Sequence, residues 1–395
     1  MKSQKNQSLL FKISLLSISL FLMMAPQISA ALPLMYNEFA GVGKAGVETL
    51  STIPNFGIIL GLVISPLFIR WIGQKFTVIL GLLVTLFAGT LPLYVSAYMV
   101  ILLSRLFLGV GIGLFNSLAV SLIPQFFKED EEELATMLGF QNVMGAVGAA
   151  ISSFLVGYLV TLSWHAAFAI YLLVIPALIL FLLFIPNDRA NHVQAEQVAH
   201  PNNKVNGKVI LIAGLMFVIF VFFMPMAYKL PILITQEGLG SLTQAALLAG
   251  ISSLLGIPLG ASFGYFFKIL HDKIFPLGFI LLASGFAILT IAPNLIVVFI
   301  GMVLLGFGSG LAIPYMYNWL AWAAPEKSMN LATTIVLVMV NIGCFLSPYI
   351  INTLTAFFGN DSPRMTMFAS TLAFIALAVY AIAHYIRVHR VSVSQ

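Results

Sequence analysis

The sequence predicts an all-α polytopic membrane protein with twelve transmembrane helices in two six-helix, pseudo-symmetric bundles. Three observations support this fold class: the composition, the number of long apolar runs and an internal repeat. Of the 395 residues, 61% are hydrophobic and only 8% are charged, and the mean hydropathy is +1.05. A soluble domain carries about 25% charged residues because its surface faces water, so this chain is expected to face lipid instead.

Twelve apolar runs, separated by turn or charge signals, account for most of the chain. A helix that crosses a hydrocarbon core roughly 30 Å thick needs about 20 mostly apolar residues, and each run is close to that length. The runs lie at 10–35, 50–68, 76–96, 99–120, 137–161, 167–185, 208–232, 244–266, 275–292, 295–318, 330–354 and 366–386.

A polar stretch divides these runs into six and six. It contains charged residues, histidines and a proline, a composition that is typical of an exposed connection. We therefore expect an N-terminal six-helix bundle at 1–185, a cytoplasmic central linker at 186–207 and a C-terminal six-helix bundle at 208–395.

The Lys and Arg residues predict the orientation, since short loops rich in them stay cytoplasmic. With the N-terminus inside, 14 of the 18 basic residues fall on the inner side, Lys44, Lys229 and Arg364 fall outside, and Arg105 lies within a span. Both termini are expected in the cytoplasm and the chain in the plasma membrane. A cleavable secretory signal ending near residue 30 is the alternative for the first run, and it would leave eleven spans.

An internal repeat relates the two halves, because a Pro and a Tyr recur 192 residues apart and glycines and basic residues recur 197–199 residues apart, in the same order. This pattern indicates two parallel halves related by an axis along the membrane normal, as in transporters. Small residues four apart let helix backbones approach closely in lipid, so we expect these glycines to serve helix packing rather than ligand binding. The glycines are Gly57, Gly61, Gly109 and Gly113 in the first half and Gly256, Gly260, Gly264, Gly306 and Gly310 in the second.

Several function classes are excluded by the motifs. The chain has no Walker-type phosphate loop, no H-E-x-x-H and no Cys/His cluster with metal spacing, and its basic residues are too scattered for a nucleic-acid interface. The G-x-S-x-G match at 260–264 lies inside an apolar helix and lacks the strand that a hydrolase needs. We expect no enzyme activity, cofactor or metal, and a driving force from an ion gradient or from the substrate itself.

Three segments resemble the major facilitator superfamily, and within it the bacterial twelve-helix multidrug and proton-antiporter exporters. The segment Leu102–Gly113 (LLSRLFLGVGIG) is similar to that family's motif B, with Leu where Gln is usual. The segment Pro66–Lys75 (PLFIRWIGQK) is similar to motif A, with Arg70 in the Asp position, and 139–171 resembles helices 5 and 6 of these exporters. The Gly-Pro pair of motif C is absent.

The resemblance implies roles for particular residues. The motif B arginine, here Arg105, is linked to proton transfer, and the motif A loops gate the cytoplasmic side. Helices 1, 4, 7 and 10 are expected to line the substrate cavity, although any one polar side chain there can equally make an interhelical hydrogen bond. The gate residues would be Arg70, Gly73, Lys75, Lys268 and Lys273. The cavity residues would be Arg105, Gln27, Asn116, Gln141, Tyr228, Lys229, Tyr315 and Asn318.

Each ionisable residue within or near a predicted span has two possible interpretations. Arg105 lies about six residues inside its helix, roughly 9 Å deep, where it either faces a cavity or ties helices together through carbonyls. Lys229 either faces the cavity or extends to the headgroups. All 13 acidic residues fall at predicted loops or span ends. Glu38 and Glu48, at the outer ends of helices 1 and 2, are either proton-coupling groups or solvated carboxylates.

Three functional hypotheses follow. The first, which rests on the resemblance, is secondary active export of a small organic compound in exchange for protons by alternating access. The second is uptake or exchange of a small organic anion, because Arg105 and Lys229 are positive and no acid is expected in the membrane interior. A sensor or scaffold without transport is the third. The expected partners are a small-molecule substrate, protons and the lipid bilayer, with no nucleic acid, and the chain is expected to work as a monomer.

Overall fold

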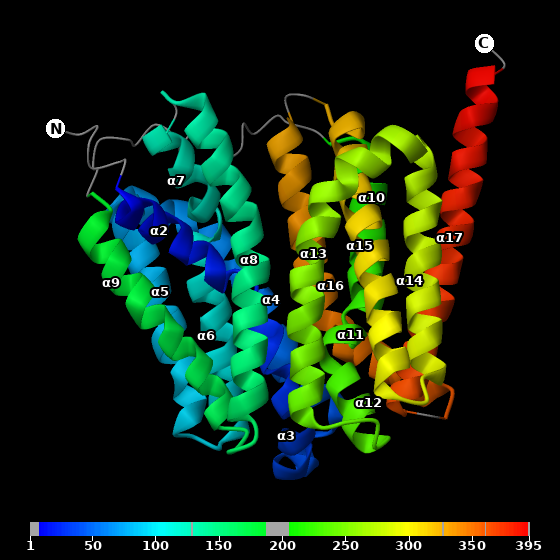
Figure 1. Cartoon of the computed structure of the whole chain (residues 1–395), viewed down its shortest axis with the longest axis horizontal. Helices are drawn as coiled ribbons and strands as arrows, with labels where there is room; N and C mark the ends of the chain where they lie inside the picture. The colour runs from blue at the N-terminus through cyan, green and yellow to red at the C-terminus, as the bar shows by residue number, and fades with distance from the viewer. Residues whose placement is uncertain (1–7, 128, 187–204, 326–327, 360, 394–395) are drawn as a thin grey trace. The chain divides into compact units, whose positions relative to one another are not determined.

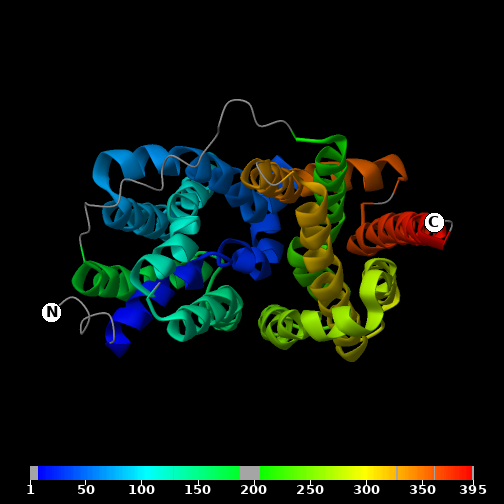
Figure 2. The same ribbon diagram turned by 90° about the horizontal axis from the view of Figure 1, so that it is seen from above.

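The computed structural model describes residues 8–127, 129–186, 205–325, 328–359 and 361–393, and every regular element within them is a helix. Eleven helices are long and apolar enough to cross a membrane, and a bent pair at the start brings the number to twelve if it is one span. The chain divides into two compact units, Met1–His200 and Pro201–Gln395, whose helices are shown in Figures 1 and 2. The predicted fold class is confirmed. The linker predicted at 186–207 falls largely at 187–204, outside the described residues.

The N-terminal unit begins with a span that is broken rather than continuous. The segments Leu9–Phe21 and Ala25–Glu38 are bent by 53° relative to each other, whereas the sequence predicts one apolar run. Pro26 and Pro33 have no backbone N–H and cannot continue a regular α-helix. The pieces are α2 (Leu9–Ser17), η1 (Ile18–Phe21), η2 (Ala25–Ala31) and α3 (Leu32–Glu38).

The remaining spans of this unit follow the predicted order. The second begins at Lys44, six residues before the predicted start, and it packs extensively on α6. The elements are η3 (Ala40–Val42), α4 (Lys44–Ile72), α5 (Gln74–Thr90), η4 (Leu91–Leu93), α6 (Tyr98–Asn116), α7 (Leu118–Phe127), α8 (Glu131–Leu159), η5 (Ala166–Leu173) and α9 (Val174–Phe184).

The C-terminal unit has a core in which α14 packs between α15 and α17. Aromatic rings fill that core: Phe286 stacks on Phe374 with centroids 5.4 Å apart, and Phe275 packs on Phe279 at 5.3 Å. The elements are α10 (Gly207–Phe223), α11 (Pro225–Tyr228), α12 (Leu230–Gln236), α13 (Leu242–Leu270), η7 (His271–Lys273), α14 (Ile274–Ile291), α15 (Leu295–Ala323), α16 (Met329–Phe357) and α17 (Pro363–Val393).

Glycines bring α4 and α6 into backbone contact in the N-terminal unit. A Cβ added at Gly57 would lie 2.1 Å from the Leu106 carbonyl oxygen, and one at Gly109 would lie 2.0 Å from the Pro54 oxygen. Added Cβ atoms at Gly61 and Gly113 would likewise lie within 2.4 Å of a carbonyl oxygen of the facing helix. No larger residue fits at this crossing, which is the close approach that small residues allow in lipid.

The equivalent glycines of the C-terminal unit differ from the prediction. A Cβ at Gly256, Gly260 or Gly264 would meet nothing within 4 Å, and one at Gly310 would lie 3.4 Å from the Cβ of Leu259. The Leu259 side chain, also 3.6 Å from a Cβ at Gly306, separates α13 from α15. The repeat therefore preserves the glycines but not their packing role.

The backbone conformation at the end of α4 and of α13 follows the internal repeat. Gly73 ends α4 with φ +84°, and His271, 198 residues later, ends α13 with φ +45°. His271 is the one residue other than glycine that has a positive φ in the described chain. The chain therefore turns in the same place in both halves, with glycine in one and histidine in the other.

Candidate functional site

Arg105 lies in the interior of the N-terminal unit. Its side chain is 0% exposed, and its guanidinium donates hydrogen bonds to three protein oxygens on three other elements. Nε donates to the Leu50 carbonyl of α4 at 2.9 Å, and the two terminal nitrogens donate to the Ala25 carbonyl of η2 and the Tyr171 hydroxyl of η5. The rings of Phe168 and Tyr171 lie 5.8 and 5.6 Å from the guanidinium carbon. Arg105 therefore ties four elements of the N-terminal unit together.

The backbone explains why an arginine is needed at this point. The Leu50 carbonyl would normally accept from the N–H four residues later, but that residue is Pro54, which has none. Ala25 is the first residue of η2, directly after the break in the first span. Arg105 therefore supplies a donor to the Leu50 carbonyl, which would otherwise be unsatisfied in a region without water, and also joins α6 to the broken span.

Glu48 lies near the start of α4, at the span end that the sequence predicts, but it is buried and is not a solvated carboxylate. Its side chain is 0% exposed because α4 begins at Lys44 and carries Glu48 into the packed unit. The Tyr36 hydroxyl of α3 donates a hydrogen bond to its carboxylate. Two residues before Glu48, the Gly46 carbonyl accepts a hydrogen bond from the Tyr98 hydroxyl at 2.9 Å. Glu38, at the end of α3, is exposed.

Lys229 is buried in the C-terminal unit at the junction of α11 and α12. Its side chain is 1% exposed, so it does not extend to the headgroups. Nζ donates to the amide oxygen of Asn352 on α16 at 2.8 Å, and the Asn352 amide nitrogen donates to the Pro348 carbonyl at 2.6 Å. The ammonium group is therefore held by protein groups of its own unit.

Tyr228, next to Lys229, joins a second carbonyl freed by proline. Its hydroxyl lies 3.0 Å from the hydroxyl of Ser347, which donates to the Val221 carbonyl at 2.6 Å. Val221 precedes Pro225 by four residues, so this carbonyl has no helical N–H to accept from. A side chain from another helix again takes the place of the missing donor.

Gln27 makes the corresponding contact in the N-terminal unit. The Ser153 hydroxyl of α8 donates to its amide oxygen at 2.6 Å, and its amide nitrogen donates to the Met23 carbonyl at 3.0 Å. Ser153 and Ser347 are 194 residues apart, so the repeat places a serine against the broken helix in both units. For Gln27 and Tyr228 the structure thus shows interhelical hydrogen bonds.

The other predicted cavity residues fall into two groups. Tyr315 is buried and donates to the Asp272 carboxylate of η7 at 2.9 Å while stacking on Phe275, so it binds the loop between α13 and α14. Asn116 and Asn318 are half-buried and Gln141 is buried. The side chains of these three amides make no hydrogen bond within the described part of the chain. They therefore retain unused donors and acceptors.

The predicted gate residues are divided between the two units and differ in their contacts. Nζ of Lys75 donates to the Leu182 carbonyl at 2.8 Å and to the Ile185 carbonyl at 2.6 Å. These two hydrogen bonds cap the end of α9 in the same unit. Arg70 is exposed in the last turn of α4, and Gly73 supplies the turn. Lys268 and Lys273 are exposed.

A model of the Major Facilitator Superfamily matches residues 13–275 and 231–394. The chain belongs to this superfamily. It is therefore a multi-pass membrane protein and a secondary transporter of a small molecule, and it is not an enzyme.

Curated relatives within the superfamily are named as nitrate transporters. The chain is 27% identical over 357 residues to the probable nitrate transporter NarT of Staphylococcus haemolyticus, which covers 87% of each chain. It is 25% identical over 384 residues to the protein of the same name from Staphylococcus aureus strain N315, which covers 94% of this chain and 92% of the relative.

Solved structures of the superfamily share the fold. The nucleoside transporter NupG has a TM-score of 0.79 at 11% identity and covers 95% of this chain and 99% of its own. A bacterial homologue of the human lysosomal transporter Spinster, in an inward-facing and unoccupied conformation, has a TM-score of 0.73 at 12% identity and covers 94% and 95%.

Several polar residues that hold these contacts were not predicted. Tyr171, Ser153 and Asn352 each bond a residue at least 66 positions away in the sequence, so no local pattern marks them. Tyr36 bonds Glu48, only 12 positions away, but on the next helix. One signal was present in the sequence, since a proline inside a span marks a free carbonyl four residues earlier. Within the described residues, no group of three or more His, Cys, Asp or Glu is placed to hold a metal ion.

Proposed function

We propose that this chain is a secondary transporter of a small monovalent anion, by uptake or exchange, with nitrate as the first substrate to test. Relatives named as nitrate transporters match over 87% and 94% of the chain, which supports this substrate class. The observation that carries the proposal within the structure is the excess of buried positive charge. Of the described residues, the buried charged side chains are Arg105, Lys229 and Glu48, two cations against one acid.

These two cations act through their field rather than by direct contact. Both are already hydrogen-bonded within their own units, but a fixed positive charge in a medium of low dielectric attracts anions over several ångströms. Asn116 and Asn318 retain free amide donors on α6 and α15 and are only half-buried. Each of these amides, together with Gln141 on α8, is proposed as a hydrogen-bond donor to the anion within its own unit.

Alternating access is proposed to occur between the two six-helix bundles, 1–185 and 208–395, joined by the segment 186–207. The excess of basic residues in the inner loops supports cytoplasmic termini and insertion in the plasma membrane. The repeat and the membership of the superfamily support a transporter that is complete as a monomer, with lipid around it.

The test is counterflow of isotopically labelled nitrate into proteoliposomes loaded with unlabelled nitrate. The wild type is expected to accumulate label transiently, and Asn116→Ala and Asn318→Ala are expected to raise the KM for nitrate about tenfold, because each removes roughly one hydrogen bond to an anion. Asn341→Ala is the matched control, since that half-buried amide bonds to Leu337 of its own helix at 2.8 Å. Absence of nitrate counterflow in the wild type would overturn the proposal.

Export of a small organic compound in exchange for protons is the second candidate. It is favoured by the burial of Glu48, because a proton-coupled exporter needs an ionisable group in its interior. The same proteoliposomes, given cationic drugs in place of nitrate, separate the two functions. Drug-evoked proton movement without nitrate counterflow would support export.

A further inference from the structure

We propose that Glu48 binds the proton that couples transport, and that Tyr36 passes its protonation state to the second half of the broken first span. This inference deepens the proposed function by naming its coupling ion, and it rests on that function. Two observations carry it. Glu48 is the acid that the described structure buries completely, and its hydrogen-bond donor belongs to an element bounded by a break.

The segment that Tyr36 belongs to is set at an angle to the start of the first span. The two parts, Leu9–Phe21 and Ala25–Glu38, are bent by 53° relative to each other, and we call the second part the rod. Arg105 binds the beginning of the rod through the Ala25 carbonyl, Ser153 binds Gln27 two residues later, and Glu48 binds the other end through Tyr36. Of these three attachments, only the carboxylate can exchange a proton, because a guanidinium stays charged and a serine hydroxyl stays protonated.

Protonation changes what Glu48 offers to Tyr36. An ionised carboxylate accepts a charge-assisted hydrogen bond, and a neutral carboxylic acid accepts a weaker one and becomes a donor itself. Proton binding therefore loosens the Tyr36 end of the rod while the Arg105 end stays fixed. The proton enters from one side of the membrane and leaves to the other, and the carboxylate is regenerated in each cycle.

Other charged and titratable groups lie on the elements packed around Glu48. Packed against α4 are α3, η2, η3, α5 and α6. The groups on these elements and on α4 itself are Tyr36, Glu38, Lys44, Arg70, Lys75, Tyr98 and Arg105. Lys44 lies four residues before Glu48 on α4, a spacing that places both side chains on one face of the helix.

The test compares two modes of nitrate transport in the same proteoliposomes. Accumulation driven by a pH gradient requires proton coupling, whereas counterflow at equal pH requires only binding and alternating access. Glu48→Gln is expected to lose at least 90% of the gradient-driven accumulation and to keep counterflow within about twofold of wild type. Glu38→Gln, an exposed acid on the neighbouring α3, is the matched control and is expected to keep both.

Tyr36→Phe is the second variant and keeps the carboxylate. It is expected to retain counterflow and to lower the ratio of protons to nitrate moved at least threefold, because the proton no longer acts on the rod. This variant decides the matter if Glu48→Gln does not fold. An unchanged ratio of protons to nitrate in Tyr36→Phe overturns the inference, and so does gradient-driven accumulation in Glu48→Gln. The inference is also overturned if the wild type shows nitrate counterflow at equal pH but no accumulation in a pH gradient. Only the loss of wild-type counterflow would overturn the proposed function.

Discussion

The Nε atom of Arg105 lies 2.9 Å from the carbonyl oxygen of Leu50, 55 residues earlier in the chain. That carbonyl lacks its helical donor because Pro54 stands four residues after it. The buried arginine of the motif B segment thus replaces a backbone hydrogen bond. It stabilises the N-terminal unit by joining α6 to α4, to the broken first span and to η5.

Replacing Arg105 by Lys is expected to destabilise the protein by about 1–3 kcal/mol, because an ammonium cannot reach three oxygens on three elements and leaves a buried carbonyl unsatisfied. Pro54→Ala restores an N–H that can bond the Leu50 carbonyl. We therefore expect Arg105→Lys to cost less in the Pro54→Ala background. A double-mutant cycle of thermal unfolding in detergent measures this coupling, and additive effects would show that Arg105 and Pro54 act independently.

The contrast between the two glycine sets gives a matched pair of substitutions. Gly109→Ala would place a Cβ 2.0 Å from the Pro54 carbonyl oxygen, and we expect separation of α4 and α6 and a loss of about 1–3 kcal/mol. Gly260→Ala meets nothing within 4 Å and is expected to be neutral or to stabilise by about 0.5–1 kcal/mol through helix propensity. Equal melting temperatures for the two variants would contradict the packing described for α4 and α6.

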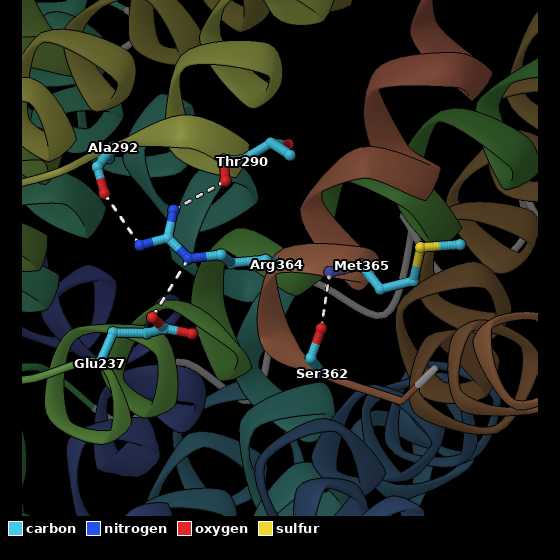
Figure 3. A network of polar contacts seen from close by, with 6 residues as sticks. All are labelled: Glu237, Thr290, Ala292, Ser362, Arg364 and Met365. Carbon is cyan, nitrogen blue, oxygen red and sulfur yellow. Dashed lines mark hydrogen bonds and ion pairs between the residues drawn. The ribbon is translucent and has the colours of Figure 1, made fainter. Parts of the chain in front are cut away.

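Arg364 both caps the end of a helix and forms an ion pair, as Figure 3 shows. Its two terminal nitrogens donate to the Thr290 and Ala292 carbonyls at 2.8 and 3.0 Å, and Nε lies 3.3 Å from the Glu237 carboxylate. These contacts join the start of α17 to the end of α14 and to the turn after α12.

Arg364→Gln is expected to lower the free energy of unfolding by about 1–2 kcal/mol at any ionic strength, because it removes donors from carbonyls at a helix end. Glu237→Gln removes only a half-exposed ion pair, so we expect a cost below about 1 kcal/mol that disappears in high salt. Thermal unfolding of both variants at low and high salt checks this difference. A cost for Arg364→Gln that vanishes with salt would show that the ion pair alone matters.

The sequence predicts the helical spans and the repeat well, because both depend on local apolar patterns. It does not predict the environment of Glu48, since the second helix was expected to begin at residue 50 and begins at Lys44. An error of six residues at a helix end is enough to turn a buried acid into a loop residue.

The partners of Arg105 and Lys229 escape prediction for a different reason. The sequence leaves Arg105 either facing a cavity or joining helices through unnamed carbonyls, and Lys229 either facing the cavity or extending to the headgroups. Their actual partners, Leu50 and Asn352, lie 55 and 123 residues away in sequence. Such pairs depend on how the helices pack against each other. The apolar pattern of a single helix does not identify its partner residues on other helices.

The serine that replaces a helical donor for Val221 has a consequence for biosynthesis. Val221 lies on α10, but its donor, Ser347, is synthesised 126 residues later on α16. Until that helix enters the bilayer, the carbonyl is exposed to a medium that offers no hydrogen bond. The C-terminal unit therefore cannot complete its polar contacts helix by helix as it leaves the ribosome. Its insertion should end in one late step, in which α16 docks against α10.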